Sequence, residues 1–261
     1  MNIHHFKQMK QQGEKISCLT AYDASFARVL SENGVEVLLV GDTLGMVIQG
    51  QATTLPVRVE DMIYHAQAVR RGAPDAFIMV DLPFASDLSL ELALTNAASI
   101  LKQSGAQMVK LEGGERRLET IRQLTTNGIP VCGHLGLTPQ SVHKLGGYKV
   151  QGRESDQAQT LLQEAKAIEQ AGADLLVLEC VPRGLGADIS GALSIPTIGI
   201  GAGPECDGQV LVLQDMLGIS PGPGAKFNKV FLQNNSIAEA ISSFVQAVKN
   251  GTYPANEHCY N

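Results

Sequence analysis

The segment MVKLEGGERRLETIRQLTTNGIPVCGH, residues 108–134, contains one complete strand–helix–strand unit. Met108–Glu112 and Pro130–His134 are short apolar runs, typical of strands that are buried on both faces of a parallel sheet. Between them, Glu115–Asn127 is a predicted helix that ends before Gly128, and glycine commonly follows the last turn of a helix. The segment therefore predicts two parallel strands joined by a crossover helix.

The same alternation extends over the whole chain. The other predicted strands are Ile16–Tyr22, Val37–Asp42, Phe77–Leu82, Leu175–Cys180, Thr197–Gly201 and a weaker one near Leu217–Ser220. The other predicted helices are Asp23–Asn33, Val59–Arg71, Ser89–Ser104, Asp156–Ala171 and Ile237–Lys249. An open doubly wound sheet also fits this order, but eight units in about 250 residues favour an α/β fold of the (β/α)8 or TIM-barrel type. No linker divides the chain, so we expect residues 1–261 to form one domain.

Composition limits the classes of function. The chain has 261 residues, 44% of them hydrophobic, and a formal net charge of −6. Its longest basic runs are isolated pairs, whereas a nucleic-acid surface needs clustered Lys and Arg, so we expect no nucleic-acid partner. The five cysteines are odd in number and form no C-x-x-C pair, which favours a reducing compartment. Residues 1–15 show no signal peptide and no run is long enough for a membrane span, so we expect a cytoplasmic protein without membrane contact.

Ionisable side chains lie at the ends of five predicted strands. In a barrel, the carboxyl ends of the strands meet at one mouth, where the active site is built. Each residue alone has a simpler explanation, because a carboxylate there often caps the next helix and a single His is often structural. Their number nevertheless favours a site to which four carboxylates, one lysine and one imidazole contribute, namely Asp42, Asp81, Lys110, Glu112, His134 and Glu179.

The excess of carboxylates predicts a bound cation, because so much buried negative charge is otherwise unfavourable. Oxygen ligands suit Mg2+, which typically takes one or two carboxylates together with substrate and water. Asp42 and Asp81 are the natural ligand pair. Zinc is the weaker alternative, and it rests on Cys132, which shares a strand face with His134.

Lys110 and Glu112 are two residues apart, so both side chains point to the same side of their strand and Leu111 points to the helical layer. A lysine in a barrel mouth beside a metal is a suitable anchor for a substrate carboxylate. The alternative is an ion pair between Lys110 and Glu112 that only neutralises itself.

Two glycine-rich segments indicate a function less specifically. Gly199-Ile-Gly201-Ala-Gly203 lacks the further glycine and the helix of a dinucleotide fingerprint, so it either cradles an anion or allows close packing. Gly133–Arg153 is long for a connector between a strand and a helix, which favours a functional loop.

Ordered blocks of sequence connect the chain to a known family. The blocks run from about Thr20 to His258 and include LTAYD (19–23), LVGDTLGMVIQG (39–50), DLPF (81–84), MVKLEGG (108–114), VCGHLGLTPQS (131–141), GGYKVQGR (146–153), LLVLECVP (175–182), IGIGAG (198–203) and YPANEH (253–258). GHLGLTPQS and GGYKVQGR are particularly specific. With these blocks, the chain resembles the ketopantoate hydroxymethyltransferase family of pantothenate biosynthesis.

The resemblance implies a barrel of the phosphoenolpyruvate/pyruvate group, one Mg2+ per subunit and 5,10-methylenetetrahydrofolate as co-substrate. The residues that match family positions are Asp42, Asp81 and Glu112 for the metal, and Asp42, Thr43, Asp81 and Lys110 for the substrate. Glu179 matches the proton acceptor, and His134 is an accessory residue of undefined role. Thr43 replaces the usual Ser, and Ala85-Ser86-Asp87 departs from the family pattern, which affects the shape of that loop.

The reaction implied by the resemblance is transfer of a hydroxymethyl group from the folate to 3-methyl-2-oxobutanoate, giving 2-dehydropantoate through a magnesium-stabilised enolate. Glu179 would remove the C3 proton, while Lys110 and Thr43 hold the carboxylate. One alternative is a metal-dependent 2-oxo acid C–C lyase of the same barrel group, and another is an inactive barrel that serves as a scaffold. Family members are large homo-oligomers, usually decamers, so we expect a homodecamer.

Overall fold

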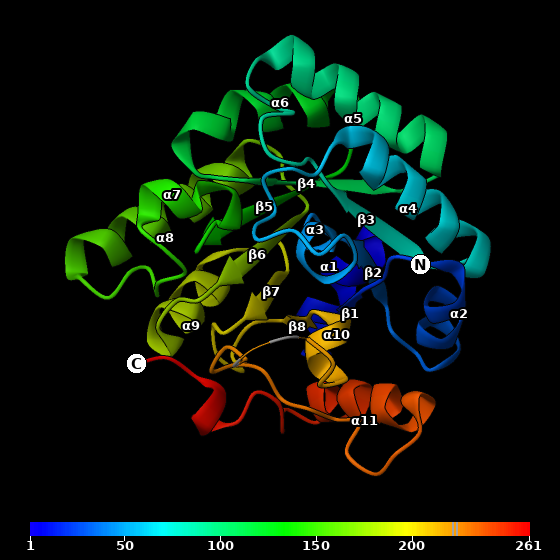
Figure 1. Ribbon diagram of the computed structural model, residues 1–261. Helices are drawn as coiled ribbons and strands as arrows, with labels where there is room; N and C mark the ends of the chain where they lie inside the picture. Colours follow the sequence, from blue (N-terminus) through cyan, green and yellow to red (C-terminus); the bar gives the residue numbers. More distant parts are fainter. Residues whose placement is uncertain (221, 223) are drawn as a thin grey trace.

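The computed structural model describes residues 1–220, 222 and 224–261, which contain a closed barrel of parallel strands surrounded by helices (Figure 1). The strands of the described residues are β1 (Ile16–Thr20), β2 (Val37–Val40), β3 (Phe77–Asp81), β4 (Met108–Glu112), β5 (Val131–Gly136), β6 (Leu175–Glu179), β7 (Thr197–Ile200) and β8 (Gly208–Leu211). Each strand pairs with its neighbours in sequence order, and β8 pairs with β1 to close the barrel. The predicted (β/α)8 barrel is confirmed.

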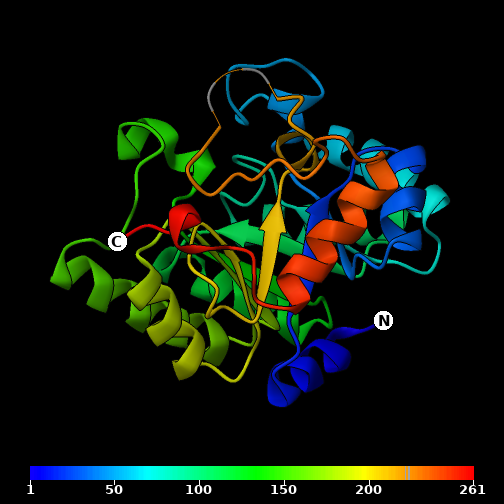
Figure 2. The ribbon, with the colours of Figure 1, turned by 90° about the horizontal axis from the view of Figure 1, so that it is seen from below.

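Helices form the outer layer around the strands (Figures 1 and 2). The α-helices of the described residues are α1 (Ile3–Gln12), α2 (Ala24–Glu32), α3 (Leu44–Val47), α4 (Val59–Gly72), α5 (Leu90–Ser104), α6 (Leu118–Thr126), α7 (Val142–Leu145), α8 (Ser155–Gln170), α9 (Arg183–Ala192), α10 (Leu213–Met216) and α11 (Ile237–Lys249). Short 3-10 turns lie at η1 (Glu115–Arg117), η2 (Pro139–Ser141) and η3 (Asn256–His258). The predicted starts of α2 and α5 are confirmed, because Asp23 and Ser89 accept hydrogen bonds from the first backbone N–H groups of these helices.

The predicted eighth strand near Leu217–Ser220 is wrong. The strand lies earlier, at Gly208–Leu211, and residues 217–220 follow α10. β8 is not an apolar run in the sequence, because it contains Gly208, which has no side chain, and the polar Gln209. In the fold, Gln209 is buried and its side-chain amide donates a hydrogen bond to a backbone carbonyl. A Cβ at Gly208 would lie 2.4 Å from the carbonyl oxygen of Ile16, so glycine allows β8 to pair closely with β1.

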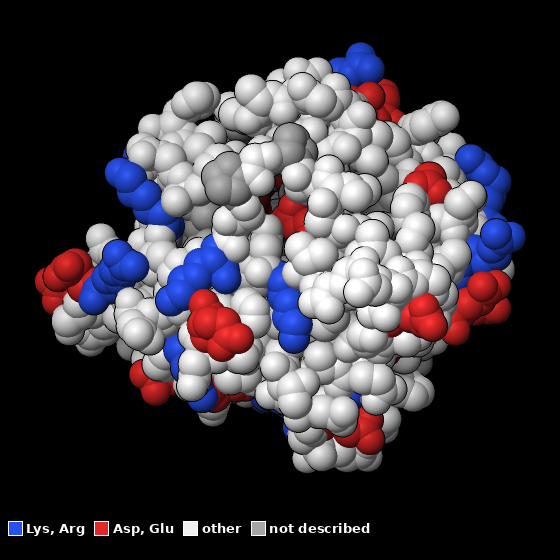
Figure 3. Space-filling view, turned by 60° about the horizontal axis from the view of Figure 1, so that its bottom comes forward, with Lys and Arg blue, Asp and Glu red and all other residues white. Residues whose placement is uncertain are grey.

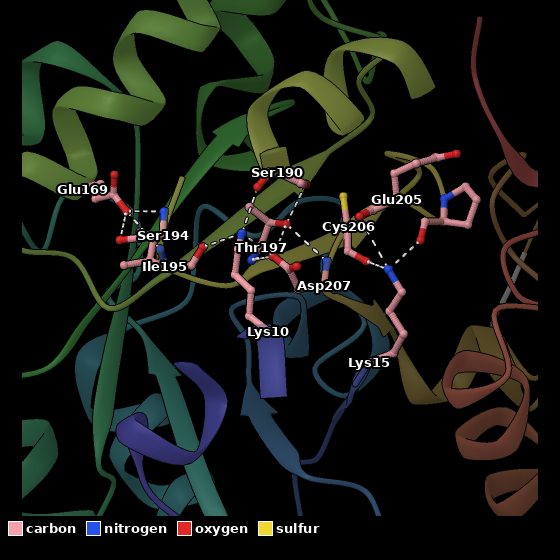
Figure 4. A network of polar contacts seen from close by, with 11 residues as sticks. Lys10, Lys15, Glu169, Ser190, Ser194, Ile195, Thr197, Glu205, Cys206 and Asp207 are labelled. Atoms are coloured by element: carbon pink, nitrogen blue, oxygen red, sulfur yellow. Dashed lines mark hydrogen bonds and ion pairs between the residues drawn. The ribbon is translucent and has the colours of Figure 1, made fainter. Parts of the chain in front are cut away.

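Helix α1 closes the end of the barrel opposite to the mouth (Figure 2). Sequence periodicity did not predict it, because Phe6 and Met9 are the buried residues of an otherwise polar segment. Phe6 packs edge-on against Phe77 at the start of β3, with ring centroids 4.9 Å apart. The Nζ atom of Lys10 is 2.8 Å from Asp207 Oδ2, just before β8 (Figure 4). These contacts hold α1 against the amino ends of the strands.

The parallel register brings the predicted polar residues to the other end of the barrel. Asp81 is level with Lys110 on the next strand, and Glu112 is level with His134. Glu179 is the last residue of β6. All five cysteines are free and buried, so none contributes a disulfide. None of the helices in the described residues is long and apolar enough to cross a membrane.

Candidate active site

One small cavity at the carboxyl ends of the strands is lined by all the residues predicted for the site. Its volume is about 50 Å³. The predicted residues on its wall are Asp42, Thr43, Asp81, Lys110, Glu112, His134 and Glu179. The barrel therefore brings together side chains that are up to 137 residues apart in the sequence, from Asp42 to Glu179.

Lys110 lies at the centre of this cluster and is 4% exposed. Its Nζ is 3.0 Å from Asp81 Oδ1, an ion pair that lacks hydrogen-bond geometry. The backbone N–H of Asp42 donates to the other oxygen of Asp81 at 3.1 Å. Burial alone would lower the pKa of Lys110, but the Asp81 and Glu112 carboxylates raise it above its ordinary value. Lys110 is thus held charged by both carboxylates, and its ion-pair partner is Asp81 and not Glu112.

His134 lies between Glu112 and Glu179. Its Nδ1 is 3.3 Å from Lys110 Nζ and 3.6 Å from Glu112 Oε1, and its Nε2 is 3.2 Å from Glu179 Oε2. Burial, assisted by the Lys110 charge, lowers the pKa of His134 well below its ordinary value, so the ring is neutral. Because the ammonium of Lys110 can only donate, Nδ1 is the acceptor. The ring hydrogen is therefore on Nε2, which lies 3.2 Å from Glu179 Oε2 without hydrogen-bond geometry.

Burial shifts the acidity of three carboxyl groups in the cavity. It raises the pKa of Glu179 to about 7, although the Lys110 charge acts in the opposite direction. Burial and the charge of Asp81 raise the pKa of Asp42, and burial with the charge of Asp42 raises that of Glu112. The cluster therefore contains more carboxylates than one lysine can neutralise, and a further cation would relieve the repulsion.

The donor set fits a hard divalent cation. Asp81 Oδ1 is buried and accepts no hydrogen bond, and Asp42 and Glu112 supply further oxygens on the same wall. In the described part of the chain, no three His, Cys, Asp or Glu side chains are grouped so that they could hold a metal ion, so Asp42, Asp81 and Glu112 are candidate ligands by their chemistry and not by a ready-made geometry. Oxygen donors suit Mg2+, which takes one or two carboxylates together with water and substrate, better than zinc. Cys132, on which the zinc alternative rests, is buried and donates to a backbone carbonyl.

Gln140, on the turn η2, is a site residue that the sequence analysis missed. Its side-chain Nε2 is 2.8 Å from Asp42 Oδ2, and its backbone N is 3.0 Å from Glu112 Oε2. Candidate residues were selected from the sequence at the ends of predicted strands and within periodic segments. Gln140 lies in neither place, so these two criteria could not select it. The available signals were its place in the block VCGHLGLTPQS and in the segment Gly133–Arg153, which favours a functional loop.

The segment Ala85-Ser86-Asp87 lies beside the site, after β3. Ala85 has a φ of +66°, in the left-handed region that disfavours a side chain. Asp87 is buried and pairs with Arg117, whose Nε is 2.9 Å from Asp87 Oδ2. Arg117 also donates to the backbone carbonyl of Glu112 at 3.3 Å. The ion pair thus connects the loop after β3 to the end of β4.

A larger cavity of about 680 Å³ adjoins the small one, and Thr43, Pro139 and Glu179 lie on the walls of both. Its mostly apolar wall includes Leu137, Tyr148, Val150, Ile200, Phe227, Val230 and Tyr260. Figure 3 shows a hollow on this face of the molecule, with acidic atoms inside it and basic side chains on the surrounding surface. Gly201 has a φ of +64°, and a Cβ there would lie 2.7 Å from the ring of Phe227, which supports close packing as the reason for the glycine motif.

Comparison with known proteins identifies the family. The model of the ketopantoate hydroxymethyltransferase family matches residues 1–256. The chain belongs to this family. A 3-methyl-2-oxobutanoate hydroxymethyltransferase of Nitrosococcus oceani is 55% identical over 261 residues, which cover 100% of this chain and 99% of the relative. The enzyme of the same name from Shewanella loihica is 55% identical over 255 residues, 97% of this chain and 96% of the relative. The protein is therefore an enzyme, a hydroxymethyltransferase.

Solved structures of low sequence similarity share the fold. A 2,3-dimethylmalate lyase of the PEP mutase/isocitrate lyase superfamily aligns with a TM-score of 0.57 at 16% identity and covers 80% of each chain. A phosphonopyruvate hydrolase, solved in complex with oxalate and Mg++, aligns with a TM-score of 0.62 at 10% identity and covers 81% of each chain. These likenesses show that this hydroxymethyltransferase shares its barrel fold with both structures.

Proposed function

We propose that the protein transfers a hydroxymethyl group from 5,10-methylenetetrahydrofolate to 3-methyl-2-oxobutanoate, giving 2-dehydropantoate in the first step of pantothenate and coenzyme A biosynthesis. The observation that carries the proposal is the position of Glu179, on the wall between a small charged cavity and a larger apolar one. The small cavity presents the charged groups that a 2-oxo acid and its metal ion would contact, and the larger one, at about 680 Å³, has room for a folate. The names of the full-length relatives support the same reaction.

Asp42, Asp81 and Glu112 would hold the Mg2+ ion, one per subunit. The surplus of buried carboxylates over cationic groups supports this assignment. When bound, the ion supplies a Lewis acid beside the 2-oxo and carboxylate oxygens of the substrate, which makes the C3 proton more acidic.

Lys110 and Thr43 would bind the substrate carboxylate. Lys110 remains charged inside the cavity because Asp81 is beside it, so it can attract an anion in a water-poor environment. The hydroxyl of Thr43 does not cap α3 and is on the cavity wall, where it can donate to the same carboxylate. Binding at this end would direct C3 of the substrate toward β6.

Glu179 would take the C3 proton. Its pKa of about 7 suits a base that works near neutral pH. The Nε2 of His134 lies 3.2 Å from the Glu179 carboxylate and is the neighbouring group that would orient it. The electron pair left by the C3–H bond forms an enolate, which attacks the methylene carbon of the folate and makes the new C–C bond. That carbon is bonded to two folate nitrogens, and the first C–N bond breaks as the C–C bond forms. The second C–N bond breaks as water supplies the hydroxyl group, and the proton taken by Glu179 and one proton of the water end on the two nitrogens of tetrahydrofolate.

The alternative of a 2-oxo acid C–C lyase is less well supported. The similarity to 2,3-dimethylmalate lyase is one of fold at 16% identity, whereas relatives at 55% identity have transferase names. An inactive scaffold would have no use for the buried charges of the small cavity, which are unfavourable for stability.

The test is a product assay with purified protein, 3-methyl-2-oxobutanoate and Mg2+, with and without 5,10-methylenetetrahydrofolate. The proposal expects 2-dehydropantoate only when the folate is present, and none after chelation. Cleavage of a 2-oxo acid without folate would favour the lyase, and no turnover of either kind would support the scaffold.

Three further assignments belong to the same proposal: a single domain, a cytoplasmic location and a homodecamer. They rest on the undivided composition, the free cysteines and the family resemblance. Light scattering after size-exclusion chromatography tests the last one, because a decamer of 27.8 kDa chains has about ten times the mass of one chain. A monomer or dimer would contradict it.

A further inference from the structure

Gln140 contacts the ends of three strands from a single position on the turn η2. Its Nε2 is 2.8 Å from Asp42 Oδ2, after β2, and 3.0 Å from the carbonyl oxygen of Leu82, after β3. Its backbone N–H donates to Glu112 Oε2, at the end of β4, at 3.0 Å. The carbonyl oxygen of Leu82 can only accept, so the NH2 group, and not the amide oxygen, must face it.

These contacts fix the orientation of two carboxylates. Within the described residues, the contact with Gln140 is the hydrogen bond that the Asp42 carboxylate accepts, and it leaves the second oxygen of Asp42 free. The backbone N–H of Gln140 engages one oxygen of Glu112, and the other oxygen faces His134 at 3.6 Å. The neutral amide of Gln suits this position, because Glu in its place would add a further carboxylate to a cavity already rich in them.

The loop itself does not depend on the side chain of Gln140. Before η2, the backbone N–H of Leu137 donates to the carbonyl of Glu179 at 2.8 Å. After α7, the backbone N–H of Gln151 donates to the carbonyl of Cys180 at 2.9 Å. Both ends of the loop are therefore attached to the end of β6 by backbone hydrogen bonds, and an anchoring role for the Gln140 amide would be redundant.

We propose that Gln140 is a positioning residue for the metal site, which holds Asp42 and Glu112 in the orientation that receives Mg2+. The inference rests on the proposed function, in which these two carboxylates are ligands. Groups that hydrogen-bond to metal ligands tune metal affinity, typically by 10–100-fold. Gln140 would act through Asp42 and Glu112, without touching the substrate.

The variant that tests this is Gln140→Met, which keeps the length of the side chain and removes the two N–H donors of its amide, to Asp42 and to Leu82, while the backbone N–H to Glu112 remains. Ser141→Ala is the matched control, because Ser141 lies on the same turn and its hydroxyl makes no hydrogen bond within the described residues. Gln140→Asn is a second variant, whose amide is one methylene too short to reach both acceptors. For each protein, titration calorimetry with Mg2+ alone gives the Kd, and the assay gives kcat and the Mg2+ concentration for half-maximal activity.

We expect Gln140→Met and Gln140→Asn to raise the Kd for Mg2+ about 10–100-fold, and Ser141→Ala to change it less than about twofold. Saturating Mg2+ should restore most of kcat, and the unfolding midpoint in EDTA should stay close to that of the parent. A Gln140 variant with the Mg2+ affinity of the parent overturns the inference and leaves the proposed function intact. If the parent itself binds no Mg2+, the proposed function fails, and the inference with it.

Discussion

Replacing Glu179 with Gln should stabilise the metal-free protein at pH 8 while it removes most of the turnover. Burial raises the pKa of Glu179 from 4.5 to about 7, so its ionised form is unfavourable in the folded state. At about 1.4 kcal/mol per pKa unit, a shift of this size corresponds to roughly 3 kcal/mol of unfolding free energy. Gln has nearly the same shape and no charge, so the variant lacks this unfavourable contribution.

The effect has a defined pH dependence. Between pH 4.5 and about 7, the folded protein keeps the proton of Glu179 while the unfolded chain has lost it. The stability of the parent therefore falls as the pH rises through this window and is fully reduced above it. The advantage of Glu179→Gln should be small near pH 5 and reach its full value at pH 8.

Urea unfolding in EDTA at pH 5 and pH 8 measures this difference directly. Groups common to both proteins, such as the neutral His134, cancel in the comparison. The argument from burial would be refuted if Glu179→Gln were less stable than the parent at pH 8. It would also be refuted if the unfolding free energies of the two proteins differed by the same amount at both pH values. In the activity assay, loss of a general base should lower kcat by about 10²–10⁴-fold.

Further changes test other parts of the molecule. Asp81→Ala should abolish measurable Mg2+ binding and turnover, because it removes a ligand and leaves Lys110 without its ion-pair partner. A near-normal Mg2+ affinity by calorimetry and a near-normal rate would contradict the assignment. Gly72→Ala should destabilise the protein by about 1–3 kcal/mol in urea unfolding, since its Cβ would lie 2.1 Å from the carbonyl oxygen of Ala24, and an unchanged midpoint would contradict this packing. Lys10→Met should lower stability by about 1–3 kcal/mol with kcat unchanged, because Asp207, far from the mouth, would lose its charged partner and keep only its hydrogen bonds from Thr197; a matching loss of kcat would contradict that separation.

The barrel could be predicted because its strands are fully buried. Runs such as Val37–Val40 and 175–178 have no polar face, and the helices between the strands begin at recognisable caps such as Asp23. Once the barrel was expected, its topology alone brought the strand-end residues to one mouth. That step needed no knowledge of side-chain contacts.

The parts that could not be predicted depend on tertiary contacts. β8 contains Gly208 and a buried Gln209, whose places are set by the neighbouring strand and by a hydrogen bond that no local pattern encodes. Gln140 reaches the site from an irregular loop, and its partners are 28 to 98 residues away in the sequence. The partner of Lys110 was also missed, because the sequence analysis considered an ion pair with Glu112, whereas Asp81 comes beside Lys110 through the pairing of β3 with β4.

Exchange of the C3 proton tests the central claim most directly. The protein is incubated with 3-methyl-2-oxobutanoate in D2O without folate, and proton NMR follows the C3 signal with Mg2+, with a chelator and with Glu179→Gln. The account predicts loss of the C3 signal for the parent with Mg2+, and retention after chelation or in the variant. Retention by the parent with Mg2+, or exchange at the parent rate in Glu179→Gln, would contradict it.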